Sequence, residues 1–78
     1  MLLKEKVIIV TGAGGGLGEG IARVCSREGA KVAVADIRGD AAENVSNDLD
    51  GESLAVHCDV ADDEALDNLV QETLSAFG

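Results

Sequence analysis

The feature that most constrains this chain is the segment VTGAGGGLGEG (Val10–Gly20), in which six of eleven residues are glycine. It directly follows the apolar, β-branched run KVIIV (Lys6–Val10), and a helical pattern begins at Leu17. Glycine loses more conformational freedom on folding than any other residue, so a cluster this dense is either a flexible linker or a loop with a defined shape. Because a strand and a helix flank the cluster closely, we predict a shaped loop.

Two further segments resemble the first strand. They are KVAVADI (Lys31–Ile37), with the strand ending at Asp36, and SLAVHCDV (Ser53–Val60). The runs in Lys6–Val10 and Lys31–Ile37 are apolar without alternation, a pattern typical of parallel strands that are covered on both faces.

A helical pattern follows each strand. The first helix is predicted to begin at Leu17 and to be capped at Gly29, the second to run from about Asp40 to Gly51, and the third to start near Asp62, where an acidic first turn suits the helix dipole. The predicted apolar stripes are Leu17, Ile21, Val24 and Cys25 in the first helix, Ala41, Ala42, Val45 and Leu49 in the second, and Leu66, Leu69, Val70, Thr73, Leu74 and Phe77 in the third.

The order β-α-β-α-β-α predicts an α/β fold: a three-stranded parallel sheet of order 3-2-1, equivalent to half of a doubly wound Rossmann-type domain. Right-handed crossovers place the first two helices on one face and the third helix on the other. Residues 1–78 then form a single domain whose first strand is an unpaired apolar edge. We therefore expect either a fragment of a longer protein or a chain that completes its sheet by self-association through this edge.

Charge and composition exclude several classes of function. Six Lys and Arg face fifteen Asp and Glu, for a net charge of −9, which does not fit a nucleic-acid binder. No run is long enough to span a membrane and no signal peptide is evident, so a cytoplasmic location is predicted. The two cysteines, Cys25 and Cys58, form no metal-binding pattern, and we predict reduced thiols and no metal site.

The spacing of the glycines shows which of the known types of nucleotide-binding loop this segment can form. A Walker A loop would begin at Gly15, but Ile21 occupies the position that requires lysine. The G-x-G-x-x-G pattern fails because Leu17 or Glu19 stands where the third glycine should be.

The pattern T-G-x-x-x-G-x-G does fit, with Thr11, Gly12, Gly16 and Gly18. A second register starting at Gly14 lacks the threonine and extends into the helix. The segments TGAGGGLG, VADI and CDV, in this order and spacing, resemble the short-chain dehydrogenase/reductase family over the whole chain.

This resemblance implies a dinucleotide cofactor whose pyrophosphate lies at the glycine loop and the following helix N-terminus. Gly12 would form the turn after the strand, Gly16 would allow close approach of the pyrophosphate, and Gly18 would allow close helix–strand contact. The resemblance implies backbone contacts with the cofactor at Gly15 and Leu17. The full set of cofactor-binding residues that it implies in the loop is Gly12, Gly14, Gly15, Gly16, Leu17 and Gly18.

The remaining implied contacts concern the adenosine. Asp36 would accept hydrogen bonds from the ribose hydroxyls and repel a 2′-phosphate, which favours NAD over NADP, although Arg38 partly offsets that repulsion. Ile37 would pack against the adenine, and Asp59 and Val60 would bind its polar edge. Asp59 has the alternative role of capping the last helix.

The family's reaction is hydride transfer between a nicotinamide and an alcohol or carbonyl, supported by a Tyr/Lys pair. This chain contains no tyrosine, so no catalytic residue is assigned to it. Three hypotheses remain: the NAD-binding segment of an oxidoreductase, a stand-alone nucleotide-binding module without chemistry, and a self-assembling unit that uses its open sheet edge.

Overall fold

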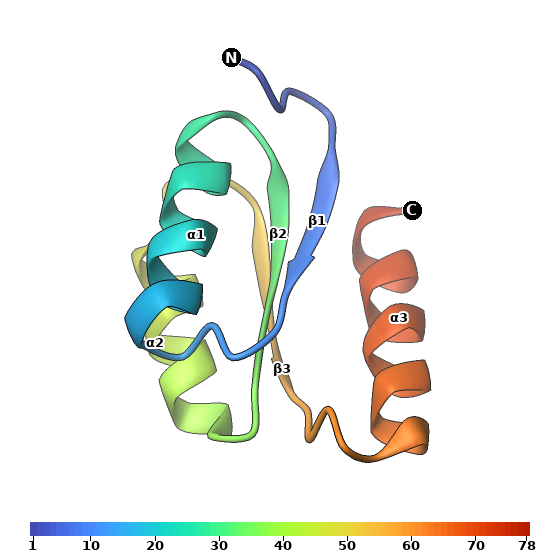
Figure 1. Cartoon of the computed structure of the whole chain (residues 1–78). Coiled ribbons are helices and arrows are strands. Elements are labelled where there is room, and N and C mark those ends of the chain that lie inside the picture. The colour runs from blue at the N-terminus through green and yellow to red at the C-terminus, as the bar shows by residue number, and fades with distance from the viewer.

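The computed structural model describes all 78 residues and contains three strands that alternate with three helices (Figure 1). The elements are β1 (Val7–Val10), α1 (Gly16–Arg27), β2 (Lys31–Asp36), α2 (Gly39–Asp48), β3 (Ser53–His57) and α3 (Asp63–Phe77).

The three strands form one parallel sheet of order β1-β2-β3, with β2 in the centre. Val7 pairs with Lys31, and Val32 pairs with Ser53. Helices α1 and α2 cover one face and α3 covers the other, so the chain is a three-layer α/β unit (Figure 1). The predicted fold, half of a doubly wound sheet in the order 3-2-1, is confirmed.

Two buried clusters lie on opposite faces of the sheet. The cluster under α1 and α2 includes Val10, Ala13, Ala22, Ala30, Val32, Val34, Ala42 and Val45. The cluster under α3 consists of Ala35, Val56, Cys58 and Leu69. Residues 32–36 of β2 are all buried, as the unbroken apolar run predicts for a central strand. Burial raises the pKa of the Cys58 thiol, which therefore packs as a neutral apolar group.

The apolar stripe predicted for α1 was wrong for three of its four residues, because only Cys25 packs against the core. Leu17, Ile21 and Val24 are 82%, 44% and 47% exposed, whereas Ala22 and Ser26 are the buried residues of this helix. Small side chains on the sheet-facing side let the helix approach the strands closely, so the larger ones are left at its flank.

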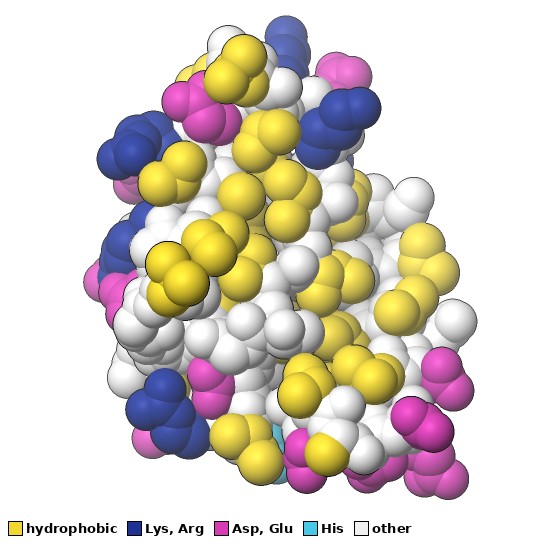
Figure 2. Space-filling view, in the orientation of Figure 1, with side chains coloured by type: hydrophobic (Ala, Val, Ile, Leu, Met, Phe, Trp, Pro, Cys, Tyr) yellow, Lys and Arg dark blue, Asp and Glu magenta, His cyan; other side chains and the backbone are white.

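β1 is covered on only one face, contrary to the prediction from its apolar run. Val7 and Ile9 remain 42% and 38% exposed, and β1 has a hydrogen-bonded neighbour on one side only. Figure 2 shows apolar side chains gathered on this side of the molecule, between α1 and α3. The exposed large apolar residues of these three elements, here called the apolar edge surface, are Val7, Ile9, Leu17, Ile21, Val24, Val70 and Leu74.

Two predicted boundaries also shift. α2 ends at Asp48 rather than near Gly51, because Leu49 turns to an extended conformation and packs against the core. β3 ends at His57 rather than at Val60, because a turn closed by the Asp62 amide and the Asp59 carbonyl at 3.0 Å follows it. None of the three helices has the length and apolar character needed to cross a membrane.

Candidate functional site

The carboxyl ends of all three strands lie at one end of the sheet, where the chain leaves each strand for the next helix (Figure 1). This end carries the glycine loop after β1, the Asp36–Arg38 turn after β2 and the Cys58–Asp62 turn after β3. In open α/β sheets, ligands bind outside the carboxyl ends of the strands. Residues from three distant parts of the sequence are therefore placed at one edge.

The glycine loop has a defined conformation. Gly12 and Gly16 have φ angles of +63° and +57°, values that other residues rarely adopt. Gly12 makes the turn directly after β1, and Gly16 opens α1. Between them, Ala13 is fully buried and its amide donates to the Ala35 carbonyl at 2.9 Å, which fastens the loop to the end of β2.

Two other glycines lie where a side chain would collide. A Cβ at Gly18 would lie 2.8 Å from the carbonyl carbon of Gly12 and 3.0 Å from the Cα of Ala13. A Cβ at Gly14 would lie 2.9 Å from Cγ of Asp36 and 2.8 Å from Cβ of Ala41. The close approach at Gly18 is therefore between the first turn of α1 and the loop itself.

The start of α1 presents backbone donors without acceptors. The N-cap residue of α1 is Gly15. Its carbonyl accepts from the Glu19 amide at 3.2 Å, but it has no side chain to accept from the amides of the first turn. The amides of Gly16, Leu17 and Gly18 have no hydrogen-bond acceptor in the chain. Such free amides, together with the helix dipole, bind anionic groups. This first turn therefore fits a pyrophosphate.

Asp36 is the most highly bonded polar side chain at this edge, and its residue is only 5% exposed. Its Oδ2 accepts from the Gly14 amide at 2.8 Å, and its Oδ1 accepts from the Arg38 amide at 2.8 Å and from Arg38 Nε at 3.3 Å. The Arg38 amide bond and then the Gly14 bond lower the pKa of this carboxyl, against the opposing effect of burial. Asp36 is consequently an anion at neutral pH.

Charged neighbours of the loop are arranged in pairs. Arg38 is paired with Asp36, and one of its terminal nitrogens is so close to Gly15 that a Cβ there would lie 3.3 Å away. Glu19, the acidic residue in the first turn of α1, accepts from Arg23 Nε and Nη2 at 2.8 and 2.6 Å. The hydrogen bond from Arg23 to the Glu19 carboxylate raises the pKa of Arg23. This pairing partly neutralises the acidic charge in the first turn of α1.

The residues predicted to contact an adenine lie at the ends of β2 and β3. Ile37 and Val60 are 59% and 53% exposed, so both offer apolar surface. Asp59 is exposed, and its Oδ1 accepts from the Ala61 amide at 2.9 Å. The N-cap of α3 is Asp62, whose carboxylate accepts from the Glu64 amide, so the capping role considered for Asp59 is wrong.

Sequence reasoning missed two residues that shape this site. Ala13 is the buried anchor of the loop, and Ala41, in the first turn of α2, packs so close to Gly14 that it limits residue 14 to glycine. The alanine between glycines gave a weak signal for the first. Nothing in the sequence indicates the second, because Ala41 reaches the loop only through the packing of α2.

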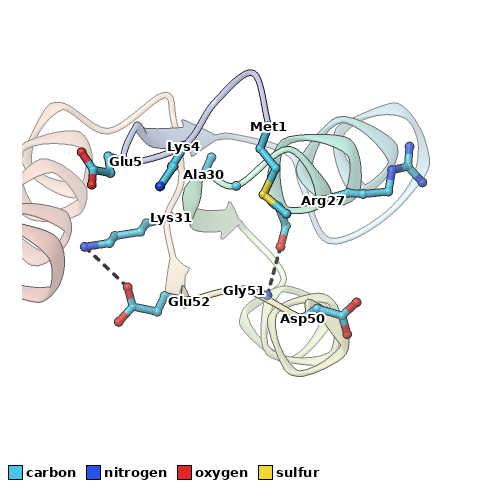
Figure 3. Close-up of a pocket in the computed structure, with 11 residues that line it drawn as sticks. Met1, Lys4, Glu5, Arg27, Ala30, Lys31, Asp50, Gly51 and Glu52 are labelled. Atoms are coloured by element: carbon cyan, nitrogen blue, oxygen red, sulfur yellow. Dashed lines mark hydrogen bonds and ion pairs between the residues drawn. The ribbon is translucent and has the colours of Figure 1, made fainter.

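The largest hollow of the surface lies elsewhere, at the amino ends of the strands (Figure 3). Most of the residues that line it are polar or charged, and Lys31 is paired with Glu52 at 3.5 Å. The lining carries three cationic residues, Lys4, Arg27 and Lys31, and three acidic residues, Glu5, Asp50 and Glu52. Because the two signs are equal in number, this lining favours neither an anionic nor a cationic ligand. None of the lining residues belongs to the glycine loop.

Three features lie at the carboxyl ends of this parallel sheet: a glycine loop, free amides at the start of the following helix and an acidic residue that ends the second strand. Together they define the dinucleotide-binding half of a Rossmann-type fold. The match to known proteins agrees with this class. The family model for short chain dehydrogenases matches residues 6–78. The chain belongs to the short-chain dehydrogenase family.

Individual relatives match nearly all of this chain but only a part of their own length. The chain is 43% identical over 76 residues to a mitochondrial borneol dehydrogenase of Lavandula x intermedia, covering 97% of this chain and 29% of the relative. It is 40% identical to the meso-2,3-butanediol dehydrogenase of Serratia marcescens, covering 100% of this chain and 32% of that protein. The chain thus spans about a third of the length of these relatives.

Solved structures give the same result. A hydroxysteroid dehydrogenase from Escherichia coli superposes with a TM-score of 0.94 at 38% identity, covering 97% of this chain and 32% of that one. A 3-ketoacyl-(acyl-carrier-protein) reductase from Brucella melitensis, complexed with NADH, also superposes with a TM-score of 0.94, at 39% identity and covering 97% of this chain and 31% of that one.

Proposed function

We propose that residues 1–78 are the NAD-binding segment of an oxidoreductase that acts on an alcohol or carbonyl. The observation that carries this proposal is the set of free amides at Gly16, Leu17 and Gly18, beside the loop that the Asp36 carboxylate holds. The chain supplies no tyrosine, so the acid–base chemistry of such a reaction is assigned to residues outside it.

Each group at the site then has a defined task. The amides at the start of α1 bind the pyrophosphate, and the backbone of Gly14 and Gly15 lines its path. Asp36 binds the adenosine ribose, while Ile37 and Val60 cover the adenine and Asp59 accepts from its amino group. When bound, the nicotinamide supplies the hydride chemistry. The residues of this chain bind and orient the cofactor.

Preference for NAD rests on Asp36. Its carboxylate is ionised and nearly buried, so a 2′-phosphate placed beside it would lose solvation and meet a like charge. Arg38 offsets this repulsion only in part, because its guanidinium is already paired with the same carboxylate and is 62% exposed. The reductase of known structure that carries NADH is consistent with a nicotinamide dinucleotide here.

The substitution Asp36→Ala tests this preference. Loss of a charged acceptor for the ribose hydroxyls should weaken NAD binding by about tenfold or more, and NADP binding should weaken less. Isothermal titration calorimetry of the variant and of the parent chain with both cofactors gives the ratio of the two Kd values. A ratio that does not change would show that Asp36 does not read the ribose.

The alternative to an oxidoreductase segment is a stand-alone nucleotide-binding or self-assembling module, and the exposed edge of β1 supplies a surface through which such a module could assemble. We propose that the 78-residue chain self-associates through the apolar edge surface, since an uncovered edge strand presents unpaired backbone groups to another chain. A small core also leaves such a chain little stability of its own.

The substitution Ile9→Lys should shift the isolated chain from dimer to monomer, because a lysine on an edge strand opposes edge-to-edge pairing. Asn47→Lys, on the exposed side of α2, adds the same charge away from this edge and should leave the mass unchanged. Light scattering after size-exclusion chromatography measures the mass of each variant. A parent chain that is a cooperatively folded monomer would contradict self-association.

A further inference from the structure

The Asp36 carboxylate contacts the glycine loop as well as the place assigned to the ribose. Its Oδ2 accepts from the Gly14 amide at 2.8 Å, and the preceding amide, that of Ala13, donates to the Ala35 carbonyl at 2.9 Å. Two consecutive loop amides are thus held by two consecutive residues of β2. The first bond is between backbone atoms, but the second depends on the side chain at position 36.

The surroundings of this bond leave the loop little freedom to move. A Cβ at Gly14 would be within 2.9 Å of Asp36 and Ala41 atoms, so the loop backbone lies directly against the carboxylate. Asp36 is 5% exposed and Gly14 is half-buried, so the bond is only partly open to water. Hydrogen bonds to a buried charged acceptor are about twice as strong as those between neutral groups.

We infer that Asp36 is a positioning residue for the glycine loop: its bond to the Gly14 amide holds the loop, before any cofactor arrives, in the shape that presents the free amides of α1. A carboxylate offers about four acceptor positions, and Gly14 N, Arg38 N and Arg38 Nε occupy three of them. One position remains for a ribose hydroxyl, so both roles fit one side chain. The effect on cofactor binding rests on the proposed function, whereas loop positioning does not.

Amide hydrogen exchange in the ligand-free chain tests loop positioning directly. The Gly14 amide should be protected in the parent chain, and Asp36→Ala or Asp36→Asn should accelerate its exchange by at least about tenfold relative to the amides of β2. Asp40→Asn is the matched control, because Asp40 Oδ1 accepts from the Ala41 amide at 2.9 Å in the neighbouring turn. The control should leave Gly14 exchange unchanged.

Two results would overturn the inference: a Gly14 amide that is unprotected in the parent chain, or one that stays protected without the Asp36 carboxylate. The first needs no variant, so a variant that fails to fold does not prevent the test. The Asn variant preserves shape and volume if the Ala variant unfolds.

Binding of two nucleotides separates loop positioning from ribose recognition. ADP and 2′,3′-dideoxyadenosine diphosphate share the pyrophosphate, but only ADP has the ribose hydroxyls. If Asp36 positions the loop, Asp36→Asn weakens both nucleotides, the dideoxy compound by about threefold or more. Unchanged binding of the dideoxy compound alongside weaker ADP binding would contradict a positioning role. If neither nucleotide binds the parent chain, the proposed function fails, and amide exchange alone decides the inference.

Discussion

Replacing Gly18 with alanine is expected to abolish dinucleotide binding and to destabilise the chain by about 3 kcal/mol or more. The added Cβ would meet the Gly12 carbonyl and lie 3.0 Å from the Cα of Ala13, which are backbone atoms that cannot turn aside. The first turn of α1 would have to move away from the loop, and its free amides would move with it. Thermal unfolding followed by circular dichroism, with calorimetry for NAD, measures both effects.

Gly20→Ala provides the matched control on the same helix. No atom lies within 4 Å of a Cβ built at Gly20, so the added methyl meets nothing. Alanine favours the helix over glycine by about 1 kcal/mol, which should raise the unfolding midpoint by about 4–8 °C in a domain of this size. Equal stability losses in the Gly18 and Gly20 variants would contradict the close approach at Gly18.

Replacing Leu69 with alanine is expected to cost about 2–5 kcal/mol and to detach α3 from the sheet. Leu69 is 2% exposed and packs in the cluster with Ala35, Val56 and Cys58. α3 alone covers this face, so no second helix compensates for the cavity. Because the chain has no tryptophan or tyrosine, urea unfolding is followed by circular dichroism rather than by fluorescence.

Leu74→Ala removes the same atoms from the same helix at a residue that is 53% exposed. Its effect on the free energy of unfolding should stay within about 0.5 kcal/mol. If the isolated chain buries Leu74 by self-association, the effect will grow with protein concentration, and the comparison is then made at the lowest measurable concentration. A Leu69 variant as stable as the Leu74 variant would show that α3 is not packed on the sheet.

Much of the fold was predictable because its signals are local. The apolar runs predict the strands, Gly29 ends α1 with a φ of +99°, and the Asp62 turn starts α3. The glycine spacing and the position of Asp36 predicted which strand ends carry the candidate site. These signals depend on residues close together in the sequence and on the steric properties of glycine.

Other features were not predictable because they depend on which surfaces meet. Periodicity places Leu17, Ile21 and Val24 on one side of a helix, but it does not state that the sheet packs against Ala22 and Ser26 instead. An apolar run likewise does not distinguish a central strand, such as β2, from an edge strand that is covered on one face, such as β1.

By itself, the sequence determined the order of strands and helices, the glycine turn and the family to which the chain belongs. Only the tertiary structure decided that the Gly14 amide meets Asp36 and that Gly18 lies against Gly12. It also decided that Ala41 limits position 14 to glycine and that Glu19 is paired with Arg23. The reason is physical: local patterns fix backbone conformation, whereas contacts between distant residues exist only once the layers have packed.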